Sequence, residues 1–566
     1  MKRRSLPVVL VLLASGLAAV PTQAAAQALI GYTVLVESGA NRDAAIAAIR
    51  AAGGTVVKQN TAVGTVTARA PESGFIEQVT ASDAVFGAAR DFTVEETTAE
   101  ASGSGSSGSV SGSVSAGSVS GSAGSGSVQG VEPDPLEDQQ WGLRMVRADL
   151  ARDKQLGSGG VYVGVLDSGI DGSHPDLSAR LDRSLSRNFT RDIPLVDGPC
   201  EVKGCVDPVD VDDDGHGTHV AGIIAASANG FGTAGVAPRV TLVNLRAQQD
   251  SGYQFLQPTV DALTYGADIG LDVINMSFFL DPWRYNCSAN PNDTPAEQIE
   301  QRTTVATMQR ALDYAYGKGV TLVSSMGNNH EDLGKPRTDT GSPDFPPDGE
   351  RARPIDNETC LKVPAESEHV LGVTALGPSQ AKSDRSDYGV ERIDLSAPGG
   401  YFKDYFGTPW YETKENRILS TYPRSASLAK GFIDADDNVT PLGVQNHLVK
   451  HCVGGTCAFY AFADGTSMAS PHVAGVAALT VSQYGTADPA RPGTLTMSPA
   501  RVERILKGTA HKVPCPSPRT VSYEQTGRTP EWNATCEGDL NFNGFYGHGI
   551  VDAYHAVTRG GEFPGV

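Results

Sequence analysis

Residues 465–475 of this chain read Gly-Thr-Ser-Met-Ala-Ser-Pro-His-Val-Ala-Gly, and they run directly into the apolar segment 476–479. Their small side chains predict a tightly buried helix with Ser467 at its start. Pro471 fits the first helical turn, where proline is tolerated. Unpaired backbone N–H groups and the positive end of the helix dipole would favour a negative charge that develops beside this serine. An isolated serine there usually only caps the helix, so a catalytic role depends on other residues.

The chain is acidic, and it begins like an exported protein. Its 566 residues carry a formal net charge of -20, which argues against nucleic acid or an anionic membrane as a partner. Basic residues Lys2 to Arg4 precede an apolar run over 8–20 and small residues up to Ala26. This order predicts a secretory signal over 1–26, because the apolar run is too short to span a bilayer. We therefore expect a secreted protein without membrane contact after signal removal.

Eight cysteines in an exported chain predict four disulfides. A zinc site is disfavoured, since the sequence contains no CxxC pair and no HExxH helix. Many pairings are open, and proximity in the sequence favours Cys200 with Cys205, Cys287 with Cys360, Cys452 with Cys457, and Cys515 with Cys536.

Residues 27–99 are expected to form a separate small domain. Its predicted elements are strands over 32–36, 54–57, 62–68 and 85–89 and helices over 42–52 and 75–80. This order is that of a ferredoxin-like α+β sandwich. Residues 100–133 consist mostly of Gly, Ser, Val and Ala and predict a flexible linker. The linker is equally consistent with a plain tether and with a segment removed during processing.

Residues 134–566 are expected to form one large α/β domain. Continuous apolar runs predict buried strands over 161–166, 240–245, 273–276, 320–323 and 370–373. Helical patterns lie between them, notably over 258–265 and 303–316. The alternation predicts a doubly wound, mainly parallel sheet, in which functional sites gather beyond the carboxyl ends of the strands.

Two further residues are candidates for chemistry with Ser467. Asp167 directly follows an apolar strand, where a carboxylate is costly unless a partner holds it. The candidate partner is His216, in the segment 214–222, Asp-Gly-His-Gly-Thr-His-Val-Ala-Gly, which opens another small-residue helix. A lone histidine is more often structural or solvated than catalytic.

The three segments, in the order Asp, His, Ser, resemble the signature segments of the subtilisin-like serine proteases (subtilases). The similarity covers about residues 134–560 and includes 275–277, 397–399 and 547–553. It implies that Ser467 attacks a peptide carbonyl, His216 transfers the proton, and Asp167 orients the imidazole. It also implies that Asn328 and the Ser467 backbone N–H bind the oxyanion. Since the base must be neutral, we expect activity to rise through an apparent pKa of about 6.5 to 7.5.

The resemblance also places the peptide substrate. An extended chain is expected to pair beside Ser277, Phe278 and Phe279, near Gly252 in the segment 251–253, and beside Gly327. The family usually has Ser-Leu-Gly where this chain has Ser-Phe-Phe. Phe279 replaces the glycine that lets a large P1 side chain pass, so we expect a reshaped or narrowed S1 pocket.

Calcium is the cofactor that the resemblance implies. The segment 227–238 is similar to the family's strong calcium loop, so Asp176 and Asn229 would give side-chain oxygens, and Ser227, Phe231 and Thr233 carbonyl oxygens. A carboxylate near Glu137 or Asp138 could complete the shell. The acidic run over 207–214 is equally consistent with a second ion and with a solvated loop. Residues 539–544 begin like an EF-hand loop, but Ile550 replaces its bidentate glutamate, so a turn is predicted.

Together these features predict a secreted, monomeric, calcium-stabilised serine endopeptidase that acts on polypeptides. The small N-terminal domain resembles the inhibitor-type propeptide of the family, which assists folding and plugs the cleft until cleavage between about 96 and 133. The alternative is a catalytically silent, subtilase-like binding or adhesion protein, which the presence of Asp167, His216, Asn328 and Ser467 disfavours. An esterase or peptide ligase would use the same residues, and no feature of the sequence favours either.

Overall fold

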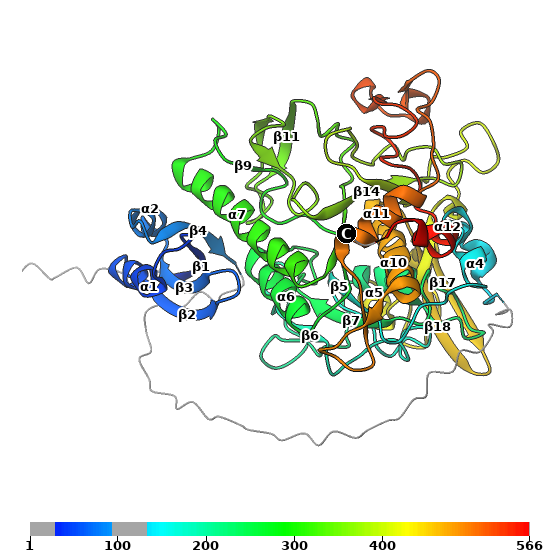
Figure 1. Ribbon diagram of the computed structural model, residues 1–566, viewed down its shortest axis with the longest axis horizontal. Helices are drawn as coiled ribbons and strands as arrows, with labels where there is room; N and C mark the ends of the chain where they lie inside the picture. Colours follow the sequence, from blue (N-terminus) through cyan, green and yellow to red (C-terminus); the bar gives the residue numbers. More distant parts are fainter. Residues whose placement is uncertain (1–28, 93–132, 565–566) are drawn as a thin grey trace, which may run out of the picture.

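The computed structural model describes residues 29–92 and 133–564 as a small unit beside a large one (Figure 1). The predicted signal over 1–26 and almost all of the predicted linker lie outside the described residues. Within these residues, no helix has the length and apolar character that crossing a bilayer requires.

The small unit is a four-stranded antiparallel sheet with two helices. Its elements are β1 (Leu29–Val36), α1 (Arg42–Ala51), β2 (Thr55–Asn60), β3 (Thr65–Pro71), α2 (Phe75–Thr80) and β4 (Val85–Asp91). The strand order β2-β3-β1-β4 is the ferredoxin-like arrangement that the sequence predicts. Its own apolar core includes Ile49 and Phe75 of the helices and Val34 of the central strand.

The large unit is built on a seven-stranded parallel sheet in the order β15-β14-β10-β8-β5-β7-β6. Its strands are β5 (Tyr162–Asp167), β6 (Arg187–Asn188), β7 (Thr241–Arg246), β8 (Val273–Met276), β10 (Thr321–Ser325), β14 (Val370–Leu376) and β15 (Leu395–Pro398). The main helices are α5 (His216–Ala225), α6 (Leu256–Asp268), α7 (Pro295–Gly317), α10 (Thr466–Tyr484), α11 (Pro499–Thr509) and α12 (Ala553–Arg559). The predicted doubly wound α/β fold is therefore confirmed.

Helices cover both faces of this sheet, because its strands are apolar on both sides. Val163 and Val165 of β5 pack into a core with α5, α10, α11 and α12, while Leu166 packs into a second core with α6 and α7. Strand β5 lies between β7 and β8, so its last residue, Asp167, is held at the middle of the sheet's carboxyl edge.

Smaller elements decorate this framework. They are α3 (Trp141–Met145), α4 (Ala148–Ala151), β9 (Asn286–Cys287), β11 (Arg337–Ser342), β12 (Arg351–Ile355), β13 (Cys360–Leu361), β16 (Ile418–Tyr422), α8 (Arg424–Ala429), α9 (Pro441–Gln445), β17 (Leu448–Val453), β18 (Thr456–Ala463), β19 (Thr486–Ala487), β20 (Leu495–Thr496), β21 (Thr520–Val521) and β22 (Ala534–Thr535). Strands β16, β18 and β17 form a separate antiparallel sheet that leads into α10.

The small unit sits against α6 and α7 of the large one (Figure 1). Lys58 of β2 pairs with Asp261 of α6 at 2.7 Å, and Arg90 of β4 pairs with Glu300 of α7 at 2.8 Å. Strand β4 packs along α7, so the end of the small unit is carried toward the carboxyl edge of the large sheet.

Four disulfides join the pairs expected from sequence proximity: Cys200–Cys205, Cys287–Cys360, Cys452–Cys457 and Cys515–Cys536. The described residues contain no free cysteine. Cys287 and Cys360 pair β9 with β13 and are buried. This bridge closes the longest loop, because its cysteines are 73 residues apart, whereas Cys200 and Cys205 are 5 apart.

We expect the long bridge to matter most for stability. On the chain-entropy model, replacing Cys287 and Cys360 by alanine lowers the free energy of unfolding by about 4 kcal/mol, against about 2 kcal/mol for Cys200 and Cys205. Urea unfolding of both double variants, made in a Ser467→Ala background to prevent self-digestion, measures the difference. Equal losses in the two variants would contradict the expectation.

Candidate active site

Asp167 and His216 form a direct pair at the carboxyl edge of the sheet. Asp167 ends β5 and is fully buried, and its Oδ1 accepts a hydrogen bond from the Ser168 N–H at 2.8 Å. The same oxygen lies 2.7 Å from Nδ1 of His216. Because a carboxylate can only accept, Nδ1 carries the proton, and Nε2 of the neutral ring is left as a base.

Helix α5 places His216 at its first residue. Gly215 precedes it with a φ of 100°, and a Cβ there would collide with the ring of Tyr422. The buried carboxylate of Asp212 accepts hydrogen bonds from the Gly215 N–H at 2.8 Å and from the Thr218 N–H at 2.9 Å. Asp212 therefore fixes the start of α5, a role that the sequence analysis missed when it assigned this residue to a possible ion site.

Three carboxylates act on the His216 imidazole. Burial lowers the pKa of His216, but the charge and hydrogen bond of Asp167, followed by the charges of Asp214 and Asp212, raise it to about 9. This value is higher than the range expected from the sequence, and the largest contribution that raises it comes from Asp167, the partner that the sequence predicted. The ring remains accessible, since 26% of the side chain is exposed.

Ser467 is the second residue of α10, and its hydroxyl lines the same cleft as His216. Its Oγ donates to the Ser277 carbonyl at 3.2 Å. Helix α10 begins at Thr466, so Pro471 lies in the second turn and not in the first, as the sequence suggested. Proline cannot donate to the Ser467 carbonyl, and this carbonyl instead accepts from the Ser277 hydroxyl at 3.1 Å.

The Asn328 side chain is oriented by the start of the same helix. Its Oδ1 accepts from the Thr466 N–H at 2.8 Å and from the Thr466 hydroxyl at 3.1 Å. Of the two ends of an amide only the oxygen accepts a hydrogen bond, so the NH₂ group of Asn328 is left free to donate. Asn328 and Ser467 line one cleft, which brings a side-chain donor and a backbone donor together.

This cleft has a volume of about 360 Å³. It is lined by all the substrate-contacting residues that the sequence predicted: Gly252, Ser277, Phe278, Phe279 and Gly327. Charged residues that the sequence analysis did not assign to the site also line it: Asp281, Arg284, Asp344, Lys362 and Arg385. Asp281 and Arg284 closely follow Phe279 in the chain, whereas Asp344, Lys362 and Arg385 come from segments distant in sequence, so no local motif marks these three.

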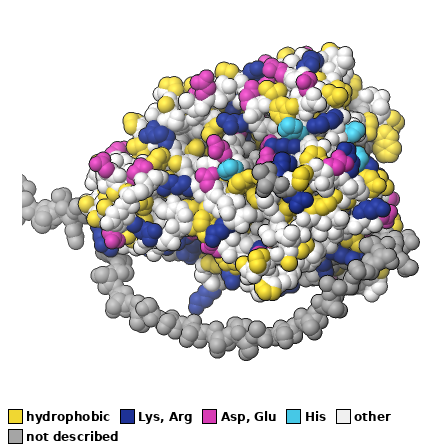
Figure 2. All heavy atoms as spheres, viewed as in Figure 1, with side chains coloured by type: hydrophobic (Ala, Val, Ile, Leu, Met, Phe, Trp, Pro, Cys, Tyr) yellow, Lys and Arg dark blue, Asp and Glu magenta, His cyan; other side chains and the backbone are white. Residues whose placement is uncertain are grey.

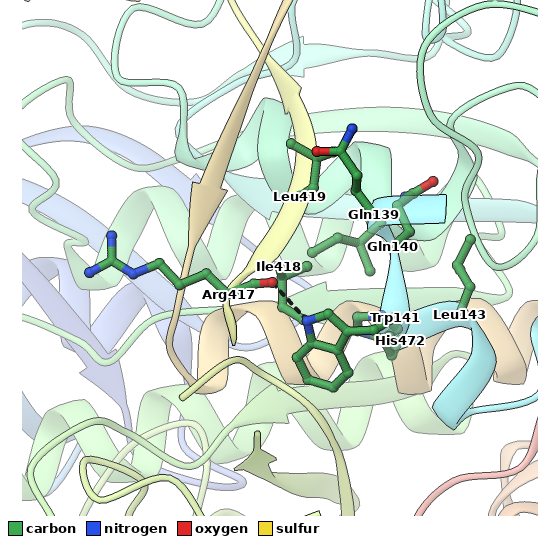
Figure 3. Close-up of a pocket in the computed structure, with 10 residues that line it drawn as sticks. Gln139, Gln140, Trp141, Leu143, Arg417, Ile418, Leu419 and His472 are labelled. Atoms are coloured by element: carbon green, nitrogen blue, oxygen red, sulfur yellow. Dashed lines mark hydrogen bonds between the residues drawn. The ribbon is translucent and has the colours of Figure 1, made fainter. Parts of the chain in front are cut away.

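A smaller cavity, of about 10 Å³, lies on the other side of α10 and holds at most a water molecule (Figure 3). The Trp141 indole N–H donates to the Arg417 carbonyl at 2.9 Å across it (Figure 3). His472 also lines it, and burial lowers the pKa of this histidine to about 4. This cavity is therefore a packing feature, and His472 is a neutral core residue.

The small unit ends at the edge of the cleft. The ring of Phe92 lies 4.8 Å from that of Phe345 and 5.3 Å from that of Phe255, centroid to centroid. Both of these rings contact Tyr253, which lines the cleft. Phe92, the last described residue of the small unit, therefore lies beside the cleft.

The predicted calcium ligands lie together around Asp176. This buried carboxylate accepts from the Tyr460 hydroxyl at 2.8 Å, the Thr233 N–H at 3.1 Å and the Asn229 Nδ2 at 3.3 Å. Burial nevertheless raises the pKa of Asp176 to about 7. Within the described residues, no backbone N–H donates a hydrogen bond to the carbonyl oxygens of Ser227, Phe231 and Thr233.

A second carboxylate faces this group, and it is Asp134. Its Oδ1 accepts from the Gly230 N–H at 2.6 Å, while its buried Oδ2 has no partner among the described residues. The sequence pointed instead to Glu137 or Asp138, but Glu137 pairs with Arg152 at 2.6 Å and Asp138 is exposed. Two carboxylates, an amide and free carbonyls are the hard oxygen donors that fit Ca²⁺.

The acidic run over 207–214 has protein partners. Beyond the role of Asp212 at α5, Asp207 binds the buried Arg246 at 2.7 Å, and Asp214 binds Lys430 at 3.0 Å. The segment resembling an EF-hand forms a turn, as predicted, in which Asp539 accepts from the Asn541 N–H at 2.7 Å.

This chain is similar to several known proteins. The model of the Subtilase family matches residues 158–549. A thermophilic serine proteinase of Bacillus sp. (strain AK1) is 29% identical over 396 residues, which cover 70% of this chain and 66% of that protein. Subtilisin DY of Bacillus licheniformis is 27% identical over 370 residues, covering 65% and 90%. The solved epidermin leader peptide processing serine protease of Staphylococcus aureus shares the fold, with a TM-score of 0.58, 19% identity, and coverage of 94% and 98%.

The carboxylates around His216 set the pH dependence of Ser467 reactivity. We expect the rate at which a fluorophosphonate modifies Ser467 to rise with pH toward about 9, because only the neutral imidazole accepts the proton. Asp214→Asn removes one charge that raises the pKa, so the midpoint should fall by roughly half a pH unit. The matched control Asp210→Asn should not move it, since Asp210 is not among the charges that raise the pKa of His216. An unchanged midpoint in Asp214→Asn would contradict this account.

Proposed function

This chain belongs to the subtilase family of serine endopeptidases, and on that premise we propose that Ser467, His216, Asp167 and Asn328 carry out peptide-bond hydrolysis. The observation that carries the proposal is one cleft lined by Ser467, His216 and Asn328, with Asp167 buried 2.7 Å behind the imidazole. Nucleophile, base and oxyanion donor are the three roles that acyl transfer needs.

The proposed reaction uses each atom in turn. Ser467 Oγ attacks the carbonyl carbon of the substrate while its proton passes to His216 Nε2, and Asp167 stabilises the resulting imidazolium. The oxyanion accepts hydrogen bonds from Asn328 Nδ2 and from the Ser467 N–H. Collapse of the intermediate breaks the C–N bond and returns the proton to the leaving amine. Water then attacks the acyl-enzyme by the same route and regenerates Ser467.

We further propose that the enzyme is secreted as a precursor whose first residues, 1–26, are a signal peptide. Residues 27–99 would be an intramolecular inhibitor and folding aid, residues 100–133 a linker, and residues 134–566 the catalytic domain, active as a monomer. The contact of Phe92 with rings beside the cleft supports the inhibitory role. The four disulfides support an extracellular location.

A structural calcium ion would be held by Asp176, Asn229 and Asp134 and by the carbonyls of Ser227, Phe231 and Thr233. Bound there, it would neutralise two carboxylates that burial otherwise disfavours. The loop 227–233 would then be tied to the segment that begins the catalytic domain.

Removing the Ser467 hydroxyl should stop catalysis without preventing the protein from folding. Ser467→Ala should abolish hydrolysis of casein and labelling by a fluorophosphonate, while the precursor is still exported. Asn328→Ala should lower kcat roughly 100-fold or more, the magnitude measured for the corresponding donor of subtilisin, because the oxyanion loses one of its two hydrogen bonds. Full activity of a purified Ser467→Ala protein would refute the assignment.

The calcium site can be tested by measuring stability instead of enzyme activity. In the Ser467→Ala background, calcium at about 100 times its Kd should stabilise the fold by about 2.7 kcal/mol, and EGTA should reverse this in thermal unfolding. Asp134→Asn should weaken the response, and the exposed matched control Asp138→Asn should retain it. If the melting temperature of the Ser467→Ala protein is the same with calcium and with EGTA, the calcium site is excluded.

A further inference from the structure

The proposed substrate cleft is lined by three cations that the proposed reaction does not use: Arg284, Lys362 and Arg385. Its walls are the loops that follow the neighbouring strands β8 and β10, whose residues Met276 and Ser324 lie in register. One wall is the segment that carries Phe279 and Phe278, of which Phe278 also packs into the core with α6 and α7, and the other is the segment 325–329. Lys362 and Arg385 also line the cleft.

Lys362 forms the floor on the side of the oxyanion loop. It is 1% exposed, and its ammonium lies directly beneath Gly327, where an added Cβ would collide with it. The ammonium binds the Asp387 carboxylate and donates to Asn329 Oδ1 at 3.1 Å. An ammonium has three N–H donors, and these two partners leave one without a hydrogen bond among the described residues, with the Tyr285 ring centroid 5.0 Å from the ammonium.

Arg385 lies on the rim of the same end. Its backbone carbonyl accepts from the His330 N–H at 2.8 Å, which places it next to the loop that carries Asn329. The residue is exposed, and within the described ranges no carboxylate or other side chain pairs with its guanidinium. This end of the cleft therefore has an uncompensated positive charge above a buried ammonium.

The carboxylates that line the cleft are those of Asp281 and Asp344, while Asp387 lies beneath Gly327 with Lys362. Asp281 Oδ2 accepts from the Gln254 N–H at 2.5 Å, and the Tyr253 hydroxyl donates to the Asp344 carbonyl at 2.9 Å. Burial raises the pKa of Asp281 well above its usual range and that of Asp344 to about 6. Arg284 acts electrostatically on both of these carboxyls. Asp387 balances the charge of Lys362, so the unpaired positive charge at this end of the cleft is that of Arg385.

We propose that this cationic end is the pocket for the P1 side chain and that it selects glutamate. The two methylene groups of glutamate would pack between the loop 325–329 and the rings of Phe278 and Phe279. Its carboxylate would accept from Lys362 Nζ and from the Arg385 guanidinium. A large aromatic side chain would meet an ammonium and an amide where it needs an apolar floor. This inference rests on the proposed function, since it assumes that Ser467 cleaves peptides.

The mature enzyme can be tested with four peptides that differ only at P1, carrying Glu, Gln, Phe or Lys. We expect kcat/KM for Glu to exceed that for Gln by roughly five-fold, because a partly desolvated charge pair forms only with Glu. Phe and Lys should be cleaved more slowly than Glu. A profile led by Phe or by Lys would overturn the proposal.

Variants then assign the preference to the two cations. Arg385→Gln should reduce the Glu to Gln ratio to roughly two-fold, and the exposed matched control Arg302→Gln should leave the ratio unchanged. Lys362 cannot be changed alone, because this would leave the buried Asp387 charge unpaired. The double variant Lys362→Gln with Asp387→Asn keeps hydrogen-bonding groups in place and should abolish the remaining preference for Glu.

The outcomes separate this proposal from the function on which it rests. If the unmodified enzyme cleaves the Gln peptide and the ratio of kcat/KM for Glu to kcat/KM for Gln is near one, the P1 assignment is wrong but the proposed function stands. A ratio that survives both Arg385→Gln and the double variant would also overturn it. If no peptide is cleaved and a fluorophosphonate fails to label Ser467, the proposed function itself fails.

Discussion

The structure depends on how a carboxylate is accommodated at the end of a strand buried on both faces. Asp167 stands where the central strand β5 stops, and it is fully buried. A charge in this position is tolerated only with good partners. The Ser168 N–H and the His216 Nδ1 supply them at 2.8 and 2.7 Å. The imidazole is therefore fixed in tautomer and direction by the same contacts that keep the carboxylate buried.

The nucleophile is held by a similar link between helix and sheet. Pro471 leaves the Ser467 carbonyl without its helical donor, and Ser277 at the end of β8 provides a replacement at 3.1 Å. Ser277 also contacts Ser470 Oγ at 2.9 Å, so the first turns of α10 are anchored to the sheet by hydroxyl groups. Proline would weaken an isolated helix. Here it frees the Ser467 carbonyl to bind Ser277, in the segment beside which the substrate is proposed to lie.

Sequence reasoning succeeded where a pattern is local. Apolar runs such as 161–166 mark strands covered on both faces, and closely spaced cysteines pair across single loops. It was incomplete where residues distant in sequence meet. Asp134 faces Asp176 only after the chain folds, and Lys362 reaches the floor beneath Gly327 from the segment before β14. The raised pKa of His216 was only partly predictable, because its main contributor, Asp167, was predicted as a partner, whereas the contribution of Asp212 was not.

The Lys362–Asp387 pair links the floor of the cleft to the oxyanion loop. Burying two charges is costly, and a pair in the interior often contributes no net stability. Here Asp387 Oδ1 also accepts from the Asn329 N–H at 2.8 Å and from the Glu331 N–H at 2.9 Å, so the carboxylate fixes the backbone on the C-terminal side of Asn328. Gly327, with a φ of 117°, lets the chain pass over the ammonium, since any side chain there would collide with it. The buried pair thus sets the path of the loop that presents the Asn328 amide, and it does so with the same ammonium that faces the cleft.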